Sequence, residues 1–229
     1  MDLLPTINQS NKSELSDLEL FVDFAERFHI NKQDNISDNI YIFQGAEWTE
    51  YIQLLESIGD ISWCRISYLD GVLELMCPGK RHENINRNME SLIVSYCDYK
   101  EIDYILMGST TYKIENLKSG KEPDSSYMFG EPKEVADLAI EINFSSGNIK
   151  DLEKFKNLGI QEVWIWDKND DLKFYFLENS EYKVIESSFF VKGIQPEIIK
   201  KYVLLMNQNE SKTRMYKKQF ISEVVSNSP

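Results

Sequence analysis

The stretch DLAIEINFSSGNIKDLEKFKNLGIQEVWIWD, residues 137–167, decides the class of fold. LAIEIN is an apolar run of strand length, IKDLEKFKNL is typical of a short helix, and EVWIWD returns to residues that favour strands. Alternation within LAIEIN places Glu141 on the face opposite Ile140 and Ile142, inside a run that otherwise predicts a buried strand. Because strand, helix and strand follow one another directly, we predict a mixed α/β domain.

The rest of the chain adds helices and strands on both sides of this unit. The spacing of apolar residues predicts further helices at 13–28, 47–58, 82–97 and 196–207. Further strands are expected at 63–69, 72–78, 104–108, 110–114, 125–129, 172–177 and 182–187. Asp70-Gly71 predicts a hairpin turn between the first two of these strands. We therefore predict an N-terminal extension with one helix over residues 1–40, one domain over 41–207 and a polar C-terminal tail over 208–229.

Composition allows one core. The chain has 229 residues, of which 42% are hydrophobic, enough for a single sizeable domain. Its three cysteines form no CxxC motif and have no histidine partners at zinc spacing, so we expect buried, reduced thiols and a cytoplasmic protein. The sequence contains no signal-peptide pattern and no apolar run of roughly 20 residues, the length of a membrane span.

The net charge of −13 argues against a broad surface for binding phosphates, because such affinity comes from clustered Lys and Arg. Two small basic clusters, KSGK (118–121) and RMYKK (214–218), supply some local positive charge, and a bound metal ion would supply more. The composition therefore lowers the expectation of tight nonspecific DNA binding without excluding a nucleic-acid substrate.

GKEPDSSYMFG, residues 120–130, places two acids around Pro123, just before an apolar strand. Proline cannot donate a hydrogen bond to a sheet, so we expect Asp124 at the entrance of a strand. If that strand neighbours the strand of Glu141, the two carboxylates converge. Two hard oxygen ligands completed by water are typical of a Mg²⁺ or Mn²⁺ site. The alternative is that Glu141 faces solvent and Asp124 caps a turn.

Several stretches together resemble the Uma-two family of restriction-endonuclease-like proteins, in the PD-(D/E)XK nuclease superfamily. They are DGVLELMCPGKRHENI, GSTTYKI, GKEPDSSYMF and LAIEINFSSGNIKDLEKFKNLGIQEVWIWD, and the resemblance covers residues 44–185. It implies a restriction-endonuclease-like fold, in which helices flank a central mixed sheet. It also implies a bound Mg²⁺ or Mn²⁺, hydrolysis of DNA phosphodiesters, and a homodimer.

The same resemblance implies roles for individual residues. Asp124 and Glu141 would hold the metal, and Glu74 matches an acidic position that can join them. His82 matches a histidine of the family at the start of the long helix. The alternatives are an exposed strand residue for Glu74 and a capping or structural histidine for His82. Glu162, at a matching junction between helix and strand, is expected to be structural.

The chain departs from the superfamily at the catalytic lysine, whose usual position two residues beyond the glutamate holds Asn143. The resemblance moves this lysine into the following helix, in an order such as IDKLE. This chain reads IKDLE, with Asp151 where the lysine is expected. One residue along a helix is a rotation of about 100°, so Lys150 must reach round, while Lys154 lies about one turn from Asp151. Both lysines are candidates for the catalytic role, and solvated surface charges are the alternative for each.

Two functions remain open. One is a Mg²⁺-dependent DNA endonuclease of restriction type, with Asp124, Glu141, Lys150 and Lys154 as catalytic residues. The other is a catalytically degenerate nuclease fold that serves as a binding or regulatory module. The intact carboxylate pair favours the first, whereas the acidic charge and the displaced lysine favour the second. We expect the endonuclease, with DNA as substrate and no membrane partner.

Overall fold

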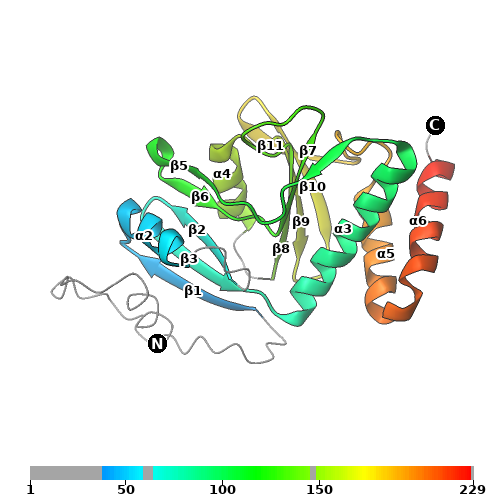
Figure 1. The fold of residues 1–229 in the computed structure, drawn as a ribbon, viewed down its shortest axis with the longest axis horizontal. Coiled ribbons are helices and arrows are strands. Elements are labelled where there is room, and N and C mark those ends of the chain that lie inside the picture. The colour runs from blue at the N-terminus through cyan, green and yellow to red at the C-terminus, as the bar shows by residue number, and fades with distance from the viewer. Residues whose placement is uncertain (1–37, 59–63, 145–147, 228–229) are drawn as a thin grey trace.

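The computed structural model of the chain describes residues 38–58, 64–144 and 148–227 (Figure 1). Its strands are β1 (Asn39–Gln44), β2 (Arg65–Leu69), β3 (Val72–Cys77), β4 (Tyr104–Leu106), β5 (Tyr112–Ile114), β6 (Ser119–Lys121), β7 (Ser125–Phe129), β8 (Leu138–Asn143), β9 (Glu162–Asp167), β10 (Leu172–Glu178) and β11 (Glu181–Ile185). Its helices are α2 (Trp48–Ile58), α3 (Lys80–Lys100), α4 (Asn148–Leu158), α5 (Pro196–Gln208) and α6 (Thr213–Asn227). The helix expected at 13–28 lies outside the described residues.

The first sheet has the strand order β1-β3-β2-β6-β5, and all neighbours are antiparallel. The predicted β2–β3 hairpin is confirmed, with φ of 46° at Asp70 and 83° at Gly71. These positive angles are the ones that a two-residue Asp-Gly turn requires. Alternation gives the sheet an apolar face, where Ile66 and Tyr68 pack with α2, and an opposite face that carries polar residues such as Ser67.

The second sheet has the order β11-β10-β9-β8-β7-β4 and is mixed. Only β8 and β9 are parallel, and a parallel pair needs a crossover connection, which α4 supplies. The strand–helix–strand unit predicted from residues 137–167 is therefore confirmed. The strands form two sheets, and the chain passes from the first to the second at Pro123, between β6 and β7.

The largest core lies between the second sheet and the helices α3, α5 and α6, which pack side by side (Figure 1). The stripe predicted on the long helix is confirmed, since Ile85, Met89, Leu92, Ile93 and Tyr96 are all buried. Helix α4 covers the other face of the sheet with Phe155. None of the helices in residues 38–58, 64–144 and 148–227 is long and apolar enough to cross a membrane.

The segment expected as a polar tail contains helix α6. Most of its residues are polar, but Phe220 and Val224 lie one turn apart and are fully buried in the main core. The ring of Phe220 packs edge-on against Tyr96 of α3 and Tyr202 of α5. Tyr216 and Ile221 of the same helix are partly buried against this core, so a few apolar residues attach the segment to the domain.

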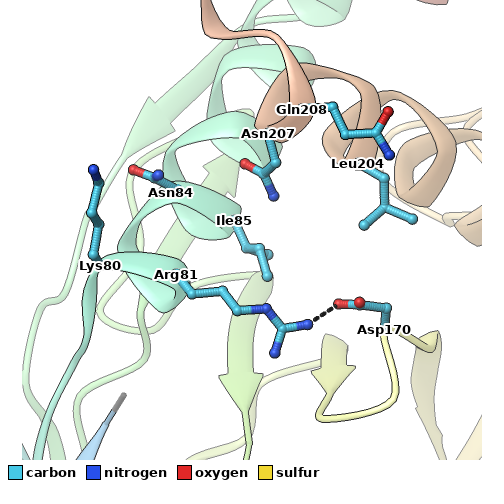
Figure 2. A pocket seen from close by; sticks show the side chains of 8 residues that line it. All are labelled: Lys80, Arg81, Asn84, Ile85, Asp170, Leu204, Asn207 and Gln208. Atoms are coloured by element: carbon cyan, nitrogen blue, oxygen red, sulfur yellow. Dashed lines mark hydrogen bonds and ion pairs between the residues drawn. The ribbon is translucent and has the colours of Figure 1, made fainter. Parts of the chain in front are cut away.

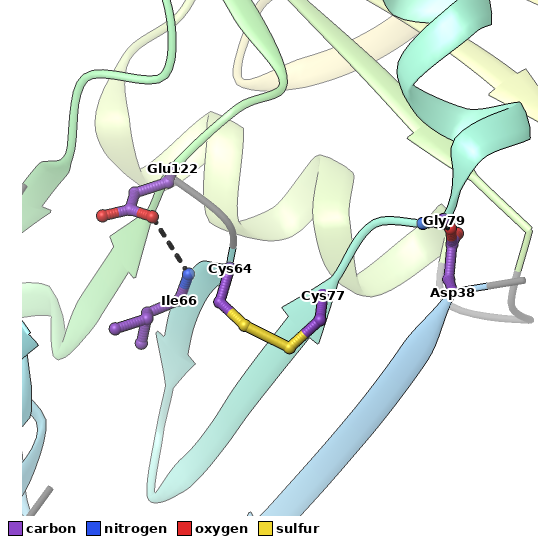
Figure 3. The surroundings of a disulfide bond; sticks show 6 residues. All are labelled: Asp38, Cys64, Ile66, Cys77, Gly79 and Glu122. Carbon is purple, nitrogen blue, oxygen red and sulfur yellow. Dashed lines mark hydrogen bonds between the residues drawn. A yellow bond between two sulfur atoms is a disulfide. The ribbon is translucent and has the colours of Figure 1, made fainter. Parts of the chain in front are cut away.

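The expectation that all three cysteines are reduced is wrong for two of them. Cys64 and Cys77 form a disulfide, whereas Cys97 is free and buried (Figure 3). Cys64 directly precedes β2 and Cys77 ends β3, and these strands pair with Arg65 opposite Met76. Continued by one residue, this antiparallel register places the two thiols opposite each other, which the sequence spacing alone does not reveal.

Candidate active site

The segment Glu122-Pro123-Asp124 carries the chain from the first sheet to the second. Glu122 stays with the first sheet, because its carboxylate accepts the N–H of Ile66 at 3.1 Å (Figure 3) and the hydroxyl of Thr111 at 2.5 Å. Pro123 has no N–H to donate to either sheet. Asp124 directly precedes β7 of the second sheet. The two acids that flank the proline therefore bond to different sheets, Glu122 to the first and Asp124 to the second.

Asp124 lies beside Glu141. Strand β7 begins with Ser125 opposite Ile140 of β8, and the N–H of Asp124 donates to the carbonyl of Ile140 at 3.1 Å. One carboxylate oxygen of Asp124 accepts the N–H of Ile142 at 2.7 Å. Asp124 therefore lies directly before β7, next to Glu141 in the interior of the neighbouring strand β8, and both acids are almost fully buried.

Two cations hold the carboxylate of Asp124. Nε2 of His82 lies 2.8 Å and Nε of Arg65 lies 3.7 Å from its Oδ1, and Nδ1 of His82 lies 3.0 Å from Oδ2 of Asp38. Burial alone would lower the pKa of His82, but Asp124 and Asp38 outweigh it and raise that pKa to about 10. Burial alone would raise the pKa of Asp124, but His82 and Arg65 hold it below its ordinary value. At neutral pH the pair is therefore a carboxylate beside an imidazolium.

Glu141 has one carboxylate oxygen that makes neither a hydrogen bond nor an ion pair with the described residues, whereas Oδ1 of Asp124 lacks a hydrogen bond but faces two cations. Its Oε1 accepts a hydrogen bond from Nζ of Lys121 at 2.5 Å, whereas its Oε2 is buried and has no hydrogen-bond partner within the described part of the chain. Burial, with the charges of Asp124 and Asp151 added, raises the pKa of Glu141 to about 8, although Lys121 opposes the shift. A buried polar atom without a partner costs about 1–3 kcal/mol, which a cation bound at this oxygen would offset.

Lys121 reaches Glu141 from the first sheet. It stands opposite Ser67 of β2, and Ser67 stands opposite Glu74 of β3, so the three residues form a row on one face. Its ammonium also lies 3.3 Å from Oδ1 of Asp151 on α4. Burial alone would lower the pKa of Lys121, but Asp151, Glu141 and Glu74 together raise it above its ordinary value. The ammonium therefore keeps its charge although it is buried.

The two lysines predicted for the catalytic role belong to α4. Nζ of Lys154 donates to the hydroxyl of Ser67 at 2.7 Å and lies 3.5 Å from Oδ1 of Asp151. These contacts place Lys154 beside Asp151 and direct its ammonium towards Ser67 of the first sheet. The side chain of Lys150 lies outside the described part of the structure, so its role stays a prediction.

The structure thus brings together five of the residues named from the sequence: Glu74, His82, Asp124, Glu141 and Lys154. They lie between the polar face of the first sheet, the ends of β7 and β8, and the helices α3 and α4. We call this group, with Arg65, Lys121 and Asp151, the charged cluster.

Sequence reasoning missed Lys121 and Asp151. The sequence shows KSGK only as a small basic cluster, whereas in the structure Lys121 of this cluster is buried, with 3% of its surface exposed. The sequence does carry a signal for this cation. Asp151 stands where the resemblance expects a lysine, and a buried acid needs a cation from another part of the chain. Lys121, three residues before Asp124, reaches the site because β6 pairs with β2. The short strand β6 was not among the predicted strands.

The acid pair fits the divalent cation that the resemblance implies. Mg²⁺ is usually held by one or two carboxylates together with water and substrate phosphate. Oε2 of Glu141 is a hard oxygen ligand that no described residue hydrogen-bonds, and Asp124 is its neighbour across the strands. Within residues 38–58, 64–144 and 148–227, no three His, Cys, Asp or Glu side chains are arranged to hold a metal, so Glu74 does not complete a third ligand here.

Glu162 lies in a different environment. Its carboxylate is fully buried and accepts the indole N–H of Trp164 at 2.6 Å and the main-chain N–H groups of Phe189 at 2.9 Å and Phe190 at 3.3 Å. These bonds fix the segment before α5 to the start of β9. They agree with the structural role expected for this residue.

A surface hollow lies between the start of α3, the end of α5 and the turn after β9 (Figure 2). The ion pair between Arg81 and Asp170, 2.7 Å long, closes one side of it. The guanidinium of Arg81 also lies 4.6 Å from the ring centre of Phe144, the residue that follows β8. None of the candidate acids lines this hollow, so the candidate site is the charged cluster.

Comparison with known proteins identifies the family of this chain. The sequence model of the Uma2 family, described as "Putative restriction endonuclease", matches residues 48–204. No curated protein matches the chain. The matched region includes every residue of the charged cluster and the strands and helices that position it. Because the match extends over more than half of the chain, and the structure has the mixed α/β architecture of a restriction-endonuclease-like fold, this chain belongs to the Uma2 family.

Proposed function

We propose that this protein is a metal-dependent DNA endonuclease of restriction type, which uses Mg²⁺ or Mn²⁺ and works as a cytoplasmic homodimer. One observation carries the proposal: among the described residues the buried Oε2 of Glu141 has no hydrogen-bond partner, and Glu141 stands beside Asp124 on the neighbouring strand. Membership of the Uma2 family supports DNA as the substrate. The dimer is an expectation from the resemblance, and the molar mass in solution tests it.

Asp124 and Glu141 would hold the cation. When bound, a divalent cation polarises the scissile phosphate and lowers the pKa of a bound water. The protein's own contribution is to keep both carboxylates in place before substrate arrives. His82, Arg65 and the N–H of Ile142 fix the carboxylate of Asp124, and Lys121 fixes Oε1 of Glu141. Preorganised charges of this kind stabilise a transition state without reorganisation during the reaction.

Hydrolysis of supercoiled plasmid DNA tests the proposal. The parent protein should convert it to nicked and linear forms in the presence of Mg²⁺ or Mn²⁺ and not in excess chelator. Glu141→Gln should slow cleavage by about 10²–10³-fold, the usual cost of losing one transition-state interaction. Glu115→Gln removes the same charge from an exposed residue, whose side chain is 73% accessible, and should leave cleavage unchanged. Equal rates in both variants would refute the assignment of Glu141.

A second candidate function is a binding module on a nuclease fold. The observation that favours it is the pairing of every buried acid in the cluster with a cation of the chain itself. Asp124 has His82 and Arg65, Glu141 has Lys121, and Asp151 has Lys121 and Lys154. A protein of this kind should bind DNA without cutting it and should gain no thermal stability from Mg²⁺ or Mn²⁺. Those two results together would select it over the endonuclease.

A further inference from the structure

We propose that Lys121 is the catalytic cation of this site and that Asp151 is the residue that positions it. The inference rests on the proposed nuclease function and assigns a role that sequence reasoning gives to Lys150 or Lys154. The observation behind it is the contact of Nζ of Lys121 with Oε1 of Glu141 at 2.5 Å and with Oδ1 of Asp151 at 3.3 Å.

The position of Lys121 is set by the first sheet. Strand β6 lies between β2 and β5, so the backbone of Lys121 is fixed from both sides, opposite Ser67 and Tyr112. The preceding Gly120 faces the apolar side, where Tyr51 packs on it, and alternation turns Lys121 to the polar side. A flexible side chain thus starts from a rigid strand and ends at Glu141, almost fully buried.

The contacts of Asp151 explain why an acid stands at the position where the resemblance expects a lysine. Its carboxylate accepts hydrogen bonds from Lys121 and from Nδ2 of Asn143, the latter at 2.5 Å, and it also lies within 3.5 Å of Lys154. The positive charge therefore comes from β6 instead of α4, and the helix supplies the counter-charge. The lysine and the acid have exchanged sides of the site.

Lys154 is less suited to the same role. Its ammonium donates to the hydroxyl of Ser67 and is held by Asp151, and in the described structure it makes no ion pair with Asp124 or Glu141. Lys121 is the lysine that touches a proposed metal ligand. An ammonium has three donors, and Glu141 and Asp151 accept two of those of Lys121. The proposal assigns the third donor to a phosphate oxygen of bound DNA.

The chemical step balances without a change in the charge of Lys121. A water oxygen forms a bond to phosphorus, the bond from phosphorus to the leaving sugar oxygen breaks, and that oxygen keeps the electron pair. The attacking water releases one proton to solvent, and the leaving oxygen takes one proton from solvent. The products are a phosphomonoester end and a hydroxyl end. Lys121 stays protonated and donates a hydrogen bond to a non-bridging oxygen, where negative charge accumulates in the transition state.

The test compares Lys121→Met with the matched variant Lys154→Met. Both remove a buried ammonium that pairs with Asp151, but only Lys121 contacts Glu141. Three quantities are measured for each: the single-turnover rate of plasmid cleavage with Mg²⁺ or Mn²⁺, the shift in melting temperature caused by either metal, and DNA affinity in Ca²⁺. Lys121→Met should slow cleavage by about 10²–10³-fold with the metal shift and the DNA affinity retained. Lys154→Met should slow it by less than about tenfold.

Lys121→Met leaves buried Glu141 without an ammonium and leaves Asp151 with that of Lys154 alone. A second variant keeps the proposal testable if this single change prevents folding. Lys121→Met/Asp151→Asn removes one acid together with the cation and should also be inactive, whereas Asp151→Asn alone should keep part of the activity. Cleavage by Lys121→Met within threefold of the parent overturns the role of Lys121 alone. A lost metal shift in that variant also overturns it, since Lys121 would then only support the metal site. A parent that cuts no DNA with either metal overturns the nuclease function itself, and this inference with it.

Discussion

His82 is fully buried in the first turn of α3 and places its Nε2 2.8 Å from Oδ1 of Asp124. Its other ring nitrogen lies 3.0 Å from Asp38. The hydrogen bond to Asp38 and the ion pair with Asp124 lie on opposite sides of the ring and fix its orientation. This contact links the long helix to the segment that joins the two sheets.

Replacing His82 by Leu should destabilise the fold strongly. Leucine has about the same volume, but Asp124 would lose its closest cation and remain buried. Breaking a buried ion pair by removing one partner usually costs about 3–5 kcal/mol. Denaturant unfolding gives this free energy, and Arg87→Leu, on an exposed position of the same helix, is the control that should change it little. A loss below about 1 kcal/mol in His82→Leu would show that the ion pair is not formed in solution.

Asp124→Asn should abolish the rise in melting temperature that Mg²⁺ or Mn²⁺ causes, because it removes one of the two proposed ligands. From the sequence alone, the metal-free fold of this variant should be unchanged or slightly steadier. The structure favours a loss of stability instead, since His82 and Arg65 would each lose one of the carboxylates that face them in a buried site, and His82 would keep only Asp38. Melting curves with and without metal measure both effects. A variant that still gains as much stability from the metal as the parent does would place the cation elsewhere.

Much of the fold follows from local pattern. The apolar stripe of α3, the Asp70-Gly71 turn and the strand–helix–strand unit at 137–167 each carry their own signal in a few neighbouring residues. The disulfide and the strand β6 could not be predicted in this way, because both depend on the register between strands that are distant in sequence. Helix α6 was missed for a different reason, since its core contact rests on few apolar residues in a polar segment.

The candidate site divides in the same manner. Asp124 and Glu141 could be named from the sequence because proline and alternation fix where each acid stands on its strand. The partners of these acids could not be named, since Lys121 and Arg65 come from the other sheet. Charge pairing across two sheets is a property of the tertiary structure. A single sequence shows only that Asp151 occupies the position on α4 where the resemblance expects a lysine.

The cysteines provide a test by counting reactive thiols. The native protein should show none, because Cys64 and Cys77 are bonded and Cys97 is buried. Burial and the nearby Asp98 also raise the pKa of Cys97 to about 12, so the thiol stays protonated when the pH rises from 7 to 9. Raising the pH through this range should not speed its labelling in the native state, in contrast to an ordinary thiol with a pKa of about 8.5.

The same count in denaturant decides whether the disulfide exists. Unfolding without reductant should expose one thiol, and unfolding with reductant should expose all three cysteines of the chain. Three thiols without reductant, in protein purified under non-reducing conditions, would show that Cys64 and Cys77 are not bonded. If they are bonded, Cys64→Ser with Cys77→Ser should lower the free energy of unfolding by about 3 kcal/mol, the value for a closed loop of roughly 15 residues.

Gly120→Ala tests the connection between packing and the charged cluster. A Cβ atom at position 120 would lie 2.1 Å from the hydroxyl oxygen and 2.5 Å from Cζ of Tyr51. Tyr51 cannot move aside easily, since it is fully buried and stacks on Tyr68 with ring centres 5.3 Å apart. Overpacking of this kind usually costs about 1–3 kcal/mol. Part of the strain should be relieved by a shift of β6, and the next residue on that strand is Lys121.

Gly120→Ala should therefore lower both stability and cleavage, whereas Gly130→Ala provides the matched comparison. Gly130 has open space around its Cβ position but a φ of +77°, so alanine there is strained by backbone conformation and meets no neighbour. Denaturant unfolding and single-turnover cleavage are measured for both variants. If the two lose similar stability, only Gly120→Ala should lose cleavage beyond that explained by unfolding, because only β6 carries Lys121. A fully active Gly120→Ala would show that displacement of β6 does not reach Glu141.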